Sequence, residues 1–273
     1  MILRVACIQP NAKPDLAANL DEVEHWIRAA HADGAGFIAT PENTSGMYGD
    51  RRSLIASALP EDGHPAVARF STLAEETGAW LLAGSVTVRL ETGKLANRSV
   101  LFDPRGRVVA RYDKIHMFDA DPADGQAYRE SATFEPGTQA VVADTDFGKI
   151  GLSICYDVRF PTLYRALALG GATMITVPAA FTVPTGKAHW HVLLRARAIE
   201  TGAFVVAPGQ VGEHAGNRFT YGHSLIVAPW GEVLADGGDQ EGFVAADCDF
   251  TEVEKARKMI RAIHHSRPFE PPA

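Results

Sequence analysis

The sequence has few cysteines and no long apolar run, and both absences limit what the protein can be. Its 273 residues include three cysteines, Cys7, Cys155 and Cys248. A small, odd number of cysteines suits a reducing compartment better than a disulfide framework. No stretch approaches the ~18 apolar residues of a membrane span, and the strand-like first ten residues show no signal peptide. These absences predict a cytoplasmic protein without a membrane span.

The chain also has no excess of positive charge. Its 26 Lys and Arg against 33 Asp and Glu give a net charge of −7, which argues against nucleic acid or an anionic membrane as a partner. No phosphate-binding glycine motif has the required context. His189 and His191, two apart on an expected helix, point to different faces, unlike the i, i+4 pairs of zinc hydrolases. We therefore expect no metal and no organic cofactor, and the sequence assigns no role to His116 or His223.

Length and composition are those of a globular chain with a full core. Hydrophobic residues make up 46% and charged residues 22%, which is ordinary for a folded domain. No linker rich in Pro, Ser or Gly divides the sequence, so residues 1–262 are expected to form one domain. Residues 263–273 contain three prolines and no core pattern, so they are expected to form an extended C-terminal arm.

One unit occurs four times: a helical stretch, a Gly-Ala pair and an apolar strand. The glycine supplies the left-handed position that ends a helix, and the strand follows at once. Apolar residues recur at helical spacing in the segments before the four pairs. These segments are residues 16–32, 65–77, 161–170 and 187–201. Helices that alternate with buried strands indicate an α/β fold.

A second repeat indicates two similar halves. Residues 99–110 and 224–235 each contain a strand, a Pro-x-Gly turn and a returning strand, which is typical of a β-hairpin. Each half thus has helix–strand units and a hairpin. We therefore expect two similar sheets that face each other, with helices outside. Strands covered on both faces explain the uninterrupted apolar runs.

Cys155 stands where one of these strands gives way to a loop and a helix. The apolar run 150–154 precedes it, a polar loop follows, and Pro161 suits the first turn of a helix. In α/β proteins ligands bind at the carboxyl ends of strands. Cys7 and Cys248 lie within strand-like runs and fit plain core filling, which is also the commoner role of any single cysteine. Its position makes Cys155 the candidate nucleophile.

A nucleophilic thiol needs a base, and the charge that develops on the substrate needs a donor. Glu42 follows the second strand, Lys114 ends the returning strand of the first hairpin, and Glu130 lies in the irregular stretch 126–131. Taken singly, each also fits a solvated surface charge. Only the fold can bring these groups to Cys155.

Three motifs, in this order, resemble the Glu-Lys-Cys triad of the nitrilase superfamily of carbon–nitrogen hydrolases. They are Pro-Glu-Asn at Glu42, Tyr-Asp-Lys-Ile-His at Lys114 and Gly-Leu-Ser-Ile-Cys-Tyr-Asp at Cys155. The similarity runs from about residue 3 to residue 250. It implies a four-layer αββα sandwich, which agrees with the two-half prediction, and a homodimer or larger homo-oligomer.

The resemblance also implies a mechanism. Glu42 is expected to be the general base, and Lys114 to stabilise the oxyanion together with the backbone N–H of Tyr156. Glu130 corresponds to a supporting glutamate that orients Lys114 and the substrate nitrogen. The cycle is thiolate attack on an amide carbon, loss of ammonia, a thioester, and hydrolysis to the carboxylate. It needs no metal or organic cofactor.

Residues after the nucleophile resemble the amidase branch rather than the nitrilases, which carry Cys-Trp-Glu. The run 177–200 is similar to deaminated glutathione amidases and the related omega-amidases. This similarity implies that Arg159 binds a keto-acid carboxylate, with Phe181 and Thr185 beside it. A surface role for Arg159 and core filling for Phe181 stay open. Pro184 is a departure from the pattern and is expected to fix a loop there.

The predicted function is therefore hydrolysis of a small linear amide, with deaminated glutathione as the expected substrate. The alternatives are an omega-amidase acting on 2-oxoglutaramate, then a nitrilase or an N-carbamoyl amino acid hydrolase. A different class is a catalytically silent binding protein with the same fold. We would expect such a protein to lack at least one of the four catalytic residue types, all of which are present here.

Overall fold

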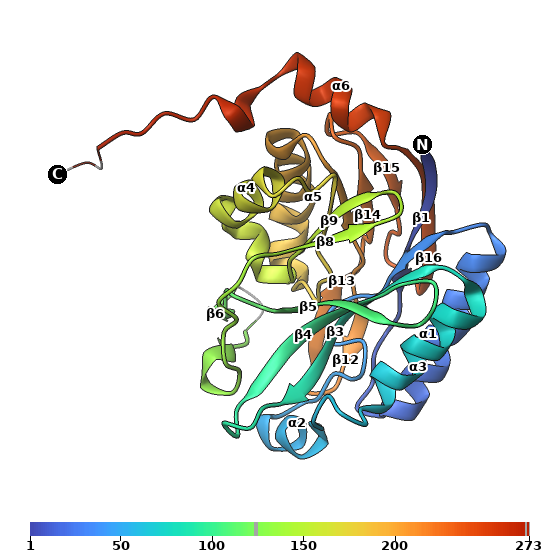
Figure 1. Ribbon diagram of the computed structural model, residues 1–273. Coiled ribbons are helices and arrows are strands. Elements are labelled where there is room, and N and C mark those ends of the chain that lie inside the picture. Colours follow the sequence, from blue (N-terminus) through green and yellow to red (C-terminus); the bar gives the residue numbers. More distant parts are fainter. Residues whose placement is uncertain (123–124, 271, 273) are drawn as a thin grey trace.

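Two six-stranded mixed sheets lie at the centre of the structure (Figure 1). The structure is a computed structural model that describes residues 1–122, 125–270 and 272. The first sheet, in spatial order, contains β16 (Gly242–Asp249), β1 (Ile2–Gln9), β2 (Phe37–Ala39), β3 (Trp80–Arg89), β4 (Leu95–Phe102) and β5 (Val108–Asp113). The second contains β15 (Val233–Asp236), β14 (Leu225–Val227), β11 (Phe204–Ala207), β10 (Met174–Thr176), β9 (Gly148–Leu152) and β8 (Val141–Thr145).

The helices flank these sheets, and two short ribbons lie beside them. The α-helices are α1 (Leu16–Ala32), α2 (Arg51–Ser57), α3 (Pro65–Thr77), α4 (Pro161–Leu169), α5 (Val183–Thr201) and α6 (Thr251–Met259). The 3-10 helices are η1 (Glu130–Ala132), η2 (Cys155–Arg159) and η3 (Ala262–His264). The ribbons pair β6 (Asp119–Ala120) with β7 (Tyr128–Arg129), and β12 (Val211–His214) with β13 (Arg218–Tyr221).

The two sheets repeat one connectivity. In each sheet three neighbouring strands run parallel: β1, β2 and β3 in the first, and β9, β10 and β11 in the second. An antiparallel hairpin, β4–β5 or β14–β15, continues the sheet at one side. An antiparallel strand, β16 or β8, closes the other side. The two predicted hairpins are confirmed, and they occupy equivalent positions in the two halves.

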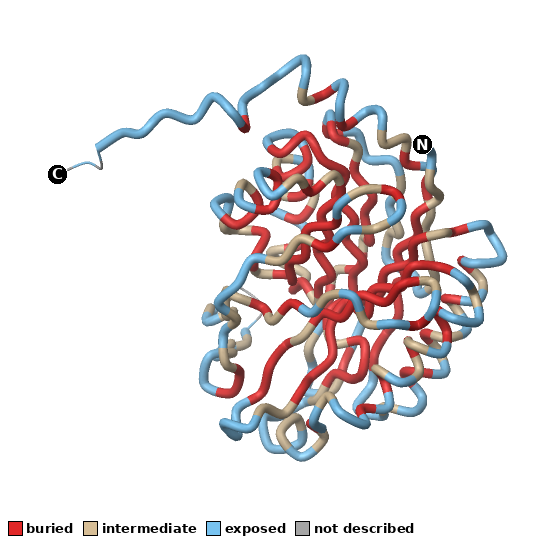
Figure 2. Tube along the Cα trace, viewed as in Figure 1, coloured by how far each residue is buried: buried red, intermediate tan, exposed pale blue. Residues whose placement is uncertain are grey.

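Side chains of the inner strands alternate between two cores. Val5 and Cys7 of β1 pack in the core shared with the second sheet, whereas Ala6 and Ile8 pack in the core beneath α1 and α3. Helices α4 and α5 cover the second sheet on its far side (Figure 1). The layers are therefore helix, sheet, sheet and helix, as predicted, and buried backbone fills the middle of the molecule (Figure 2).

Helix ends follow the repeated Gly-Ala unit. Gly78 after α3 and Gly202 after α5 adopt left-handed φ values of 63° and 56°, which an L-residue rarely adopts without strain. The structure departs from prediction at the start of α5, which begins at Val183 rather than near residue 187. Pro184 fits its first turn because N–H groups there lack intrahelical acceptors. The expectation that Pro184 fixes a loop is therefore wrong.

The C-terminal segment leaves the sandwich after η3. Ile263 is buried, and residues 264–270 are exposed. The exposed part of the predicted 263–273 arm thus begins after Ile263, and residues 271 and 273 of that arm lie outside the described residues. Within the described ranges, the structure has no helix both long enough and apolar enough to cross a bilayer.

Candidate active site

All eight predicted site residues line one cavity of about 280 Å³. They reach it from elements far apart in sequence, because Glu42 follows β2, Lys114 follows β5 and Cys155 follows β9. The predicted residues that line the cavity are Glu42, Lys114, Glu130, Cys155, Tyr156, Arg159, Phe181 and Thr185. The carboxyl ends of strands from both sheets therefore form one site, as expected for an α/β fold.

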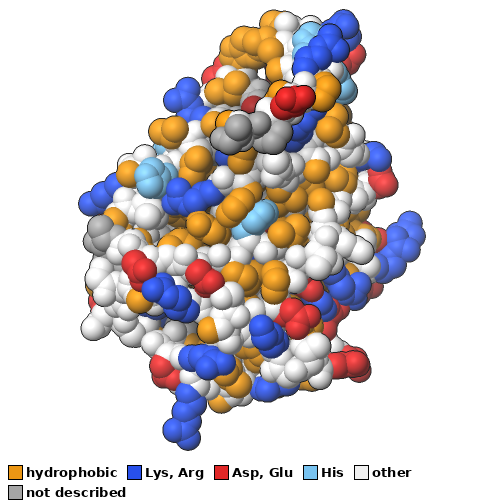
Figure 3. Space-filling model, turned by 90° about the vertical axis from the view of Figure 1, so that its left-hand side faces the viewer, with side chains coloured by type: hydrophobic (Ala, Val, Ile, Leu, Met, Phe, Trp, Pro, Cys, Tyr) orange, Lys and Arg blue, Asp and Glu red, His pale blue; other side chains and the backbone are white. Residues whose placement is uncertain are grey.

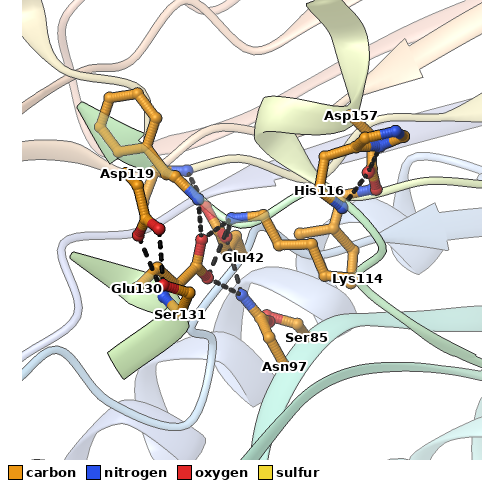
Figure 4. A network of polar contacts seen from close by, with 12 residues as sticks. Glu42, Ser85, Asn97, Lys114, His116, Asp119, Glu130, Ser131 and Asp157 are labelled. Carbon is orange, nitrogen blue, oxygen red and sulfur yellow. Dashed lines mark hydrogen bonds and ion pairs between the residues drawn. The ribbon is translucent and has the colours of Figure 1, made fainter. Parts of the chain in front are cut away.

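Lys114 lies between the two glutamates (Figure 4). Its Nζ donates to Glu42 Oε1 at 2.9 Å and to Glu130 Oε2 at 2.8 Å. Burial alone would lower the pKa of Lys114, but the charges of Glu130 and Glu42 raise it well above the ordinary value. Burial alone would raise the pKa of Glu42, but the charge of Lys114 holds it below its ordinary value. The resting site thus contains an ammonium and an ionised Glu42 carboxylate.

The Glu42 carboxylate is held by donors on both oxygens. Asn97 Nδ2 donates to Oε1 at 2.9 Å, and the backbone N–H of Ala180 donates to Oε2 at 2.9 Å. The same Asn97 amide lies 3.3 Å from Glu130 Oε1. A buried carboxylate needs such donors, because leaving it unpaired costs several kcal/mol. The bonds fix one orientation of Glu42, and its charge lies close enough to Cys155 to raise the pKa of the thiol.

Cys155 begins η2 in a strained conformation. Its φ of 47° lies in the left-handed region, which is uncommon for a residue with a Cβ and concentrates at functional sites. Its backbone N–H donates to the carbonyl of Pro178 at 2.9 Å. Burial and the nearby Glu42 charge raise the pKa of the thiol well above its ordinary value. The resting cysteine is therefore a neutral thiol beside an ionised carboxylate.

Asp157 anchors the loop that carries the thiol. Its buried carboxylate accepts the hydroxyl of Tyr112 at 2.6 Å and the backbone N–H groups of Ile154 at 2.8 Å and His116 at 3.0 Å. The His116 ring also contacts it, with Nδ1 2.7 Å away, and stacks on Phe160. His116, which the sequence left without a role, thus belongs to the support of the nucleophile loop.

The first turn of η2 leaves a donor beside the thiol. N–H groups in a first turn lack intrahelical acceptors. The N–H of Cys155 is taken by Pro178, and that of Asp157 by the carbonyl of Ile154. Among the described residues no acceptor is recorded for the N–H of Tyr156. This is the backbone donor that the resemblance assigns to the oxyanion.

Arg159 forms part of the cavity wall and has no carboxylate partner in the described part of the chain. Its guanidinium lies 5.3 Å from the ring centroid of Phe181 and 5.9 Å from that of Tyr156. Among the described residues, its guanidinium has hydrogen-bond contacts to His189 Nδ1 alone, at 3.3 Å. Phe181 also packs on Trp190, so it both fills core and lines the cavity. Thr185, in the first turn of α5, has its hydroxyl 2.8 Å from that of Thr182.

Sequence reasoning missed Asn97 and Asp157. Asn97 is a buried polar residue inside the largely buried strand β4, and such a residue requires hydrogen-bond partners. A polar residue at a position expected to be buried was the available signal for Asn97, but it does not show which residues Asn97 contacts. Asp157 was noted only as part of the motif after the nucleophile.

The histidines of α5 diverge, as predicted: His189 contacts Arg159, whereas His191 turns to Asp236. The Asp236 carboxylate lies 2.9 Å from His191 Nε2 and 2.8 Å from His223 Nδ1. The ligand atoms of these three residues lie within 4.8 Å of one another, close enough to hold a metal ion. None of the three lines the cavity of Cys155. The expectation that the protein uses no metal stays a prediction.

The four-layer sandwich and its strand-end cavity define an α/β enzyme, and comparison with known proteins gives its family. The model of the carbon-nitrogen hydrolase family matches residues 4–258. The chain belongs to the carbon-nitrogen hydrolase family, whose members include nitrilases and amidases.

Similar proteins include amidases of two kinds. A deaminated glutathione amidase of Synechocystis is 41% identical over 266 residues, covering 95% of this chain and 96% of the relative. The human omega-amidase is 33% identical over 265 residues, covering 97% of this chain and 95% of the relative. The crystal structure of the C. elegans NitFhit protein matches with a TM-score of 0.90 at 32% identity. That match covers 97% of this chain and 65% of the NitFhit chain.

Proposed function

We propose that this protein is a thiol amidase that hydrolyses deaminated glutathione. The observation that carries the proposal is the cavity itself. Cys155, an ionised Glu42 and a protonated Lys114 lie together there, with Arg159 on the wall, where no carboxylate of the described residues pairs with it. This set supplies a nucleophile, a base, an oxyanion donor and a carboxylate binder. A relative with that activity covers nearly the whole chain.

In the first half-reaction Glu42 takes the proton of Cys155 as Sγ attacks the amide carbon. The oxyanion that forms is stabilised by Lys114 Nζ and the N–H of Tyr156. The C–N bond then breaks, the leaving nitrogen takes the proton from Glu42, and a thioester to Cys155 remains. Glu130 holds Lys114 from its second side and orients the substrate nitrogen.

In the second half-reaction Glu42 takes a proton from water, which attacks the thioester carbon. The new oxyanion uses the same two donors. Collapse breaks the C–S bond, Glu42 returns its proton to sulfur, and the acid product leaves as a carboxylate after losing its own proton to solvent. The thiol route replaces one difficult step with two easier ones. Glu42 carries the proton in both half-reactions, and no redox step occurs.

The leaving group depends on the substrate. Deaminated glutathione, as glutathione with a keto group in place of its amine, contains no primary amide. Its hydrolysis therefore releases an amine, and the ammonia expected from the sequence applies to primary amides such as 2-oxoglutaramate. In both compounds the acyl part ends in a keto acid. Arg159 binds that carboxylate, the Phe181 ring covers the aliphatic carbons, and Thr185 supplies a hydroxyl beside them.

The active form is a homodimer in the cytoplasm. Apolar side chains are exposed on the two helices that flank the nucleophile loop: Leu169 is the last residue of α4, and Val192 and Ile199 lie on α5. Hydrophobic side chains also gather in the middle of the face that includes the side of α4 (Figure 3). Such patches favour association. The three cysteines are free and buried, which suits a reducing compartment.

Omega-amidase activity on 2-oxoglutaramate is the second candidate, because the human omega-amidase also covers nearly the whole chain. Arg159 on the cavity wall suits the keto-acid carboxylate of either substrate. A substrate panel decides between them. It contains deaminated glutathione, 2-oxoglutaramate, a simple aliphatic amide, an N-carbamoyl amino acid and a nitrile, with amine and ammonia measured separately.

We expect the highest kcat/KM for deaminated glutathione, with release of an amine. A higher value for 2-oxoglutaramate would establish the second candidate instead. Hydrolysis of the nitrile alone, or of the N-carbamoyl compound alone, would overturn amidase function. Turnover of none of them would favour a silent binding protein.

A further inference from the structure

The cavity wall carries more positive charge than the reaction uses. Arg51, Arg129, Arg159 and Arg218 all line it, in a chain whose net charge is −7. The acidic lining residues are already engaged: Glu42 and Glu130 pair with Lys114, and Asp50 accepts from Ser53 as the N-cap of α2. The outer part of the cavity is therefore suited to an anion.

The four arginines differ in what holds them. Arg51 donates to Thr133 and to the carbonyl of Ala132. Arg129 pairs with Asp121. Arg218, on the β13 strand of the small ribbon, has no hydrogen bond or ion pair from its guanidinium to any described residue. It lies over the ring of Tyr128, 5.3 Å from the centroid.

A row of aromatic rings joins Arg218 to Arg159. Tyr128 contacts Phe118 with centroids 5.1 Å apart, and Phe118 contacts Tyr156 at 5.0 Å. Arg159 lies over the far end of this row, at Tyr156. The row thus has a guanidinium at each end, and neither one has a carboxylate partner within the described ranges of the chain. Cys155 directly precedes Tyr156.

We propose that Arg218 binds a second carboxylate of the substrate, carried by the amine that leaves. The inference rests on the proposed function and deepens it. A guanidinium stacked on a ring keeps its N–H donors free, and its fork matches a carboxylate. The substrate class is a secondary amide with a keto acid at the acyl end and an amino acid or short peptide, ending in a free carboxylate, at the amine end.

This subsite separates the two candidate substrates. Deaminated glutathione has a glycine carboxylate at its amine end, whereas the nitrogen of 2-oxoglutaramate carries no substituent. Arg159 contributes to the binding of both substrates, but Arg218 contributes only to the binding of deaminated glutathione. A preference for the longer substrate then arises in KM, because the Arg218 contact lies away from the bond that breaks and holds the substrate in both ground and transition states.

The first test compares deaminated glutathione with its C-terminal methyl ester, measured by amine release. Arg218→Ala should raise KM for the acid about 10- to 100-fold, as expected for a lost charge-assisted hydrogen bond, and change the ester less than twofold. Arg218→Lys should restore part of the loss. Arg129→Ala, in the same cavity but paired with Asp121, should leave the acid-to-ester ratio unchanged. Equal losses on acid and ester, or an equal effect of Arg129→Ala, would overturn the proposal.

A second measurement separates this subsite from the catalytic proposal. In the Cys155→Ser background, which cannot form a thioester, calorimetry gives the affinity for the acid and the ester with and without Arg218→Ala. Tighter binding of the acid that disappears with Arg218→Ala supports the subsite even if the wild type fails to hydrolyse the compound. Equal binding of acid and ester in the presence of Arg218 overturns the subsite even if hydrolysis occurs.

Discussion

Lys114 Nζ lies 2.9 Å from Glu42 Oε1, and the two side chains are only 2% and 5% exposed. Their opposite charges therefore stabilise each other with little solvent screening. Removing one member of such a pair leaves a buried charge uncompensated. Glu130 also pairs with Lys114. Loss of the Glu42 charge therefore leaves Lys114 with a partner, whereas loss of the Lys114 charge leaves Glu42 without its cation.

The first prediction concerns the loss of the Glu42 charge. Glu42→Gln should lower kcat at least about 1000-fold, because the thiol loses its base and stays neutral. The variant should still fold, since Glu130 continues to pair with Lys114. Turnover and thermal unfolding of the purified variant check both parts. Folding with kcat within tenfold of the wild type would exclude Glu42 as the base.

The second prediction concerns Asn97, which donates to Glu42. Asn97→Ala should lower kcat about tenfold with little change in KM, since the group orients the base and does not hold the substrate. Loss of a donor to the ionised form raises the carboxyl pKa, so the acidic limb of the pH profile should move to higher pH. A fall in kcat with an unmoved limb would mean that Asn97 acts only through stability.

Features of this site that follow from local sequence patterns could be predicted, whereas contacts between distant segments could not. Three of the four predicted helices and the two hairpins follow from local patterns and were predicted nearly to the residue, whereas α5 begins earlier than expected and α2 and α6 were not predicted. The contact between Asn97 and Glu42 is different, because it depends on strand register. Arg98 pairs with Asp113 across β4 and β5, which places Asn97 beside Lys114. No local pattern specifies that register, so the hydrogen-bond network could not be predicted.

The convergence of Glu42, Lys114 and Cys155 also has no local signal. Their separations along the chain carry no geometric information, and only the resemblance to a family placed them together. The start of α5 was missed for another reason: Pro184 was expected to fix a loop, although proline also fits the first turn of a helix. The convergence of the three residues therefore depends on packing between elements distant in sequence, whereas the start of α5 depends on which of two local roles the proline takes.

The third prediction is the pH dependence of the wild type. Lys114 holds the pKa of Glu42 below its ordinary 4.5, and the two glutamates hold the pKa of Lys114 well above 10.5. The base is thus ionised and the oxyanion donor protonated throughout the neutral range. We expect kcat/KM to form a plateau from about pH 5 to pH 9 for a substrate that does not titrate there. An acidic limb centred above pH 6 would contradict the ionised resting state.

The same shifts predict a contribution to stability. A lowered Glu42 pKa stabilises the folded state above the unfolded value and ceases to do so as pH falls through the folded value. The raised Lys114 pKa stabilises it below 10.5 and ceases to do so as pH rises through the folded value. Both contributions are complete at pH 7.

The fourth prediction is selective alkylation of Cys155. It lines the cavity, whereas Cys7 and Cys248 have no exposed surface. Iodoacetamide should therefore label Cys155 first, at a rate that substrate lowers and Glu42→Gln reduces. Mass spectrometry of peptides identifies the site. Three cysteines labelled equally slowly would count against a catalytic thiol.

The last prediction concerns Arg159, whose guanidinium has aromatic rings and His189 as partners but no carboxylate among the described residues. Arg159→Ala should lower kcat/KM for keto-acid amides at least about 100-fold, because a charge-assisted bidentate contact is lost. Its effect on the free energy of unfolding should stay near 1 kcal/mol, the scale of an exposed cation–π contact. An uncharged aliphatic amide serves as the control. Equal losses on both substrates would show that Arg159 positions the nucleophile loop instead of binding the carboxylate.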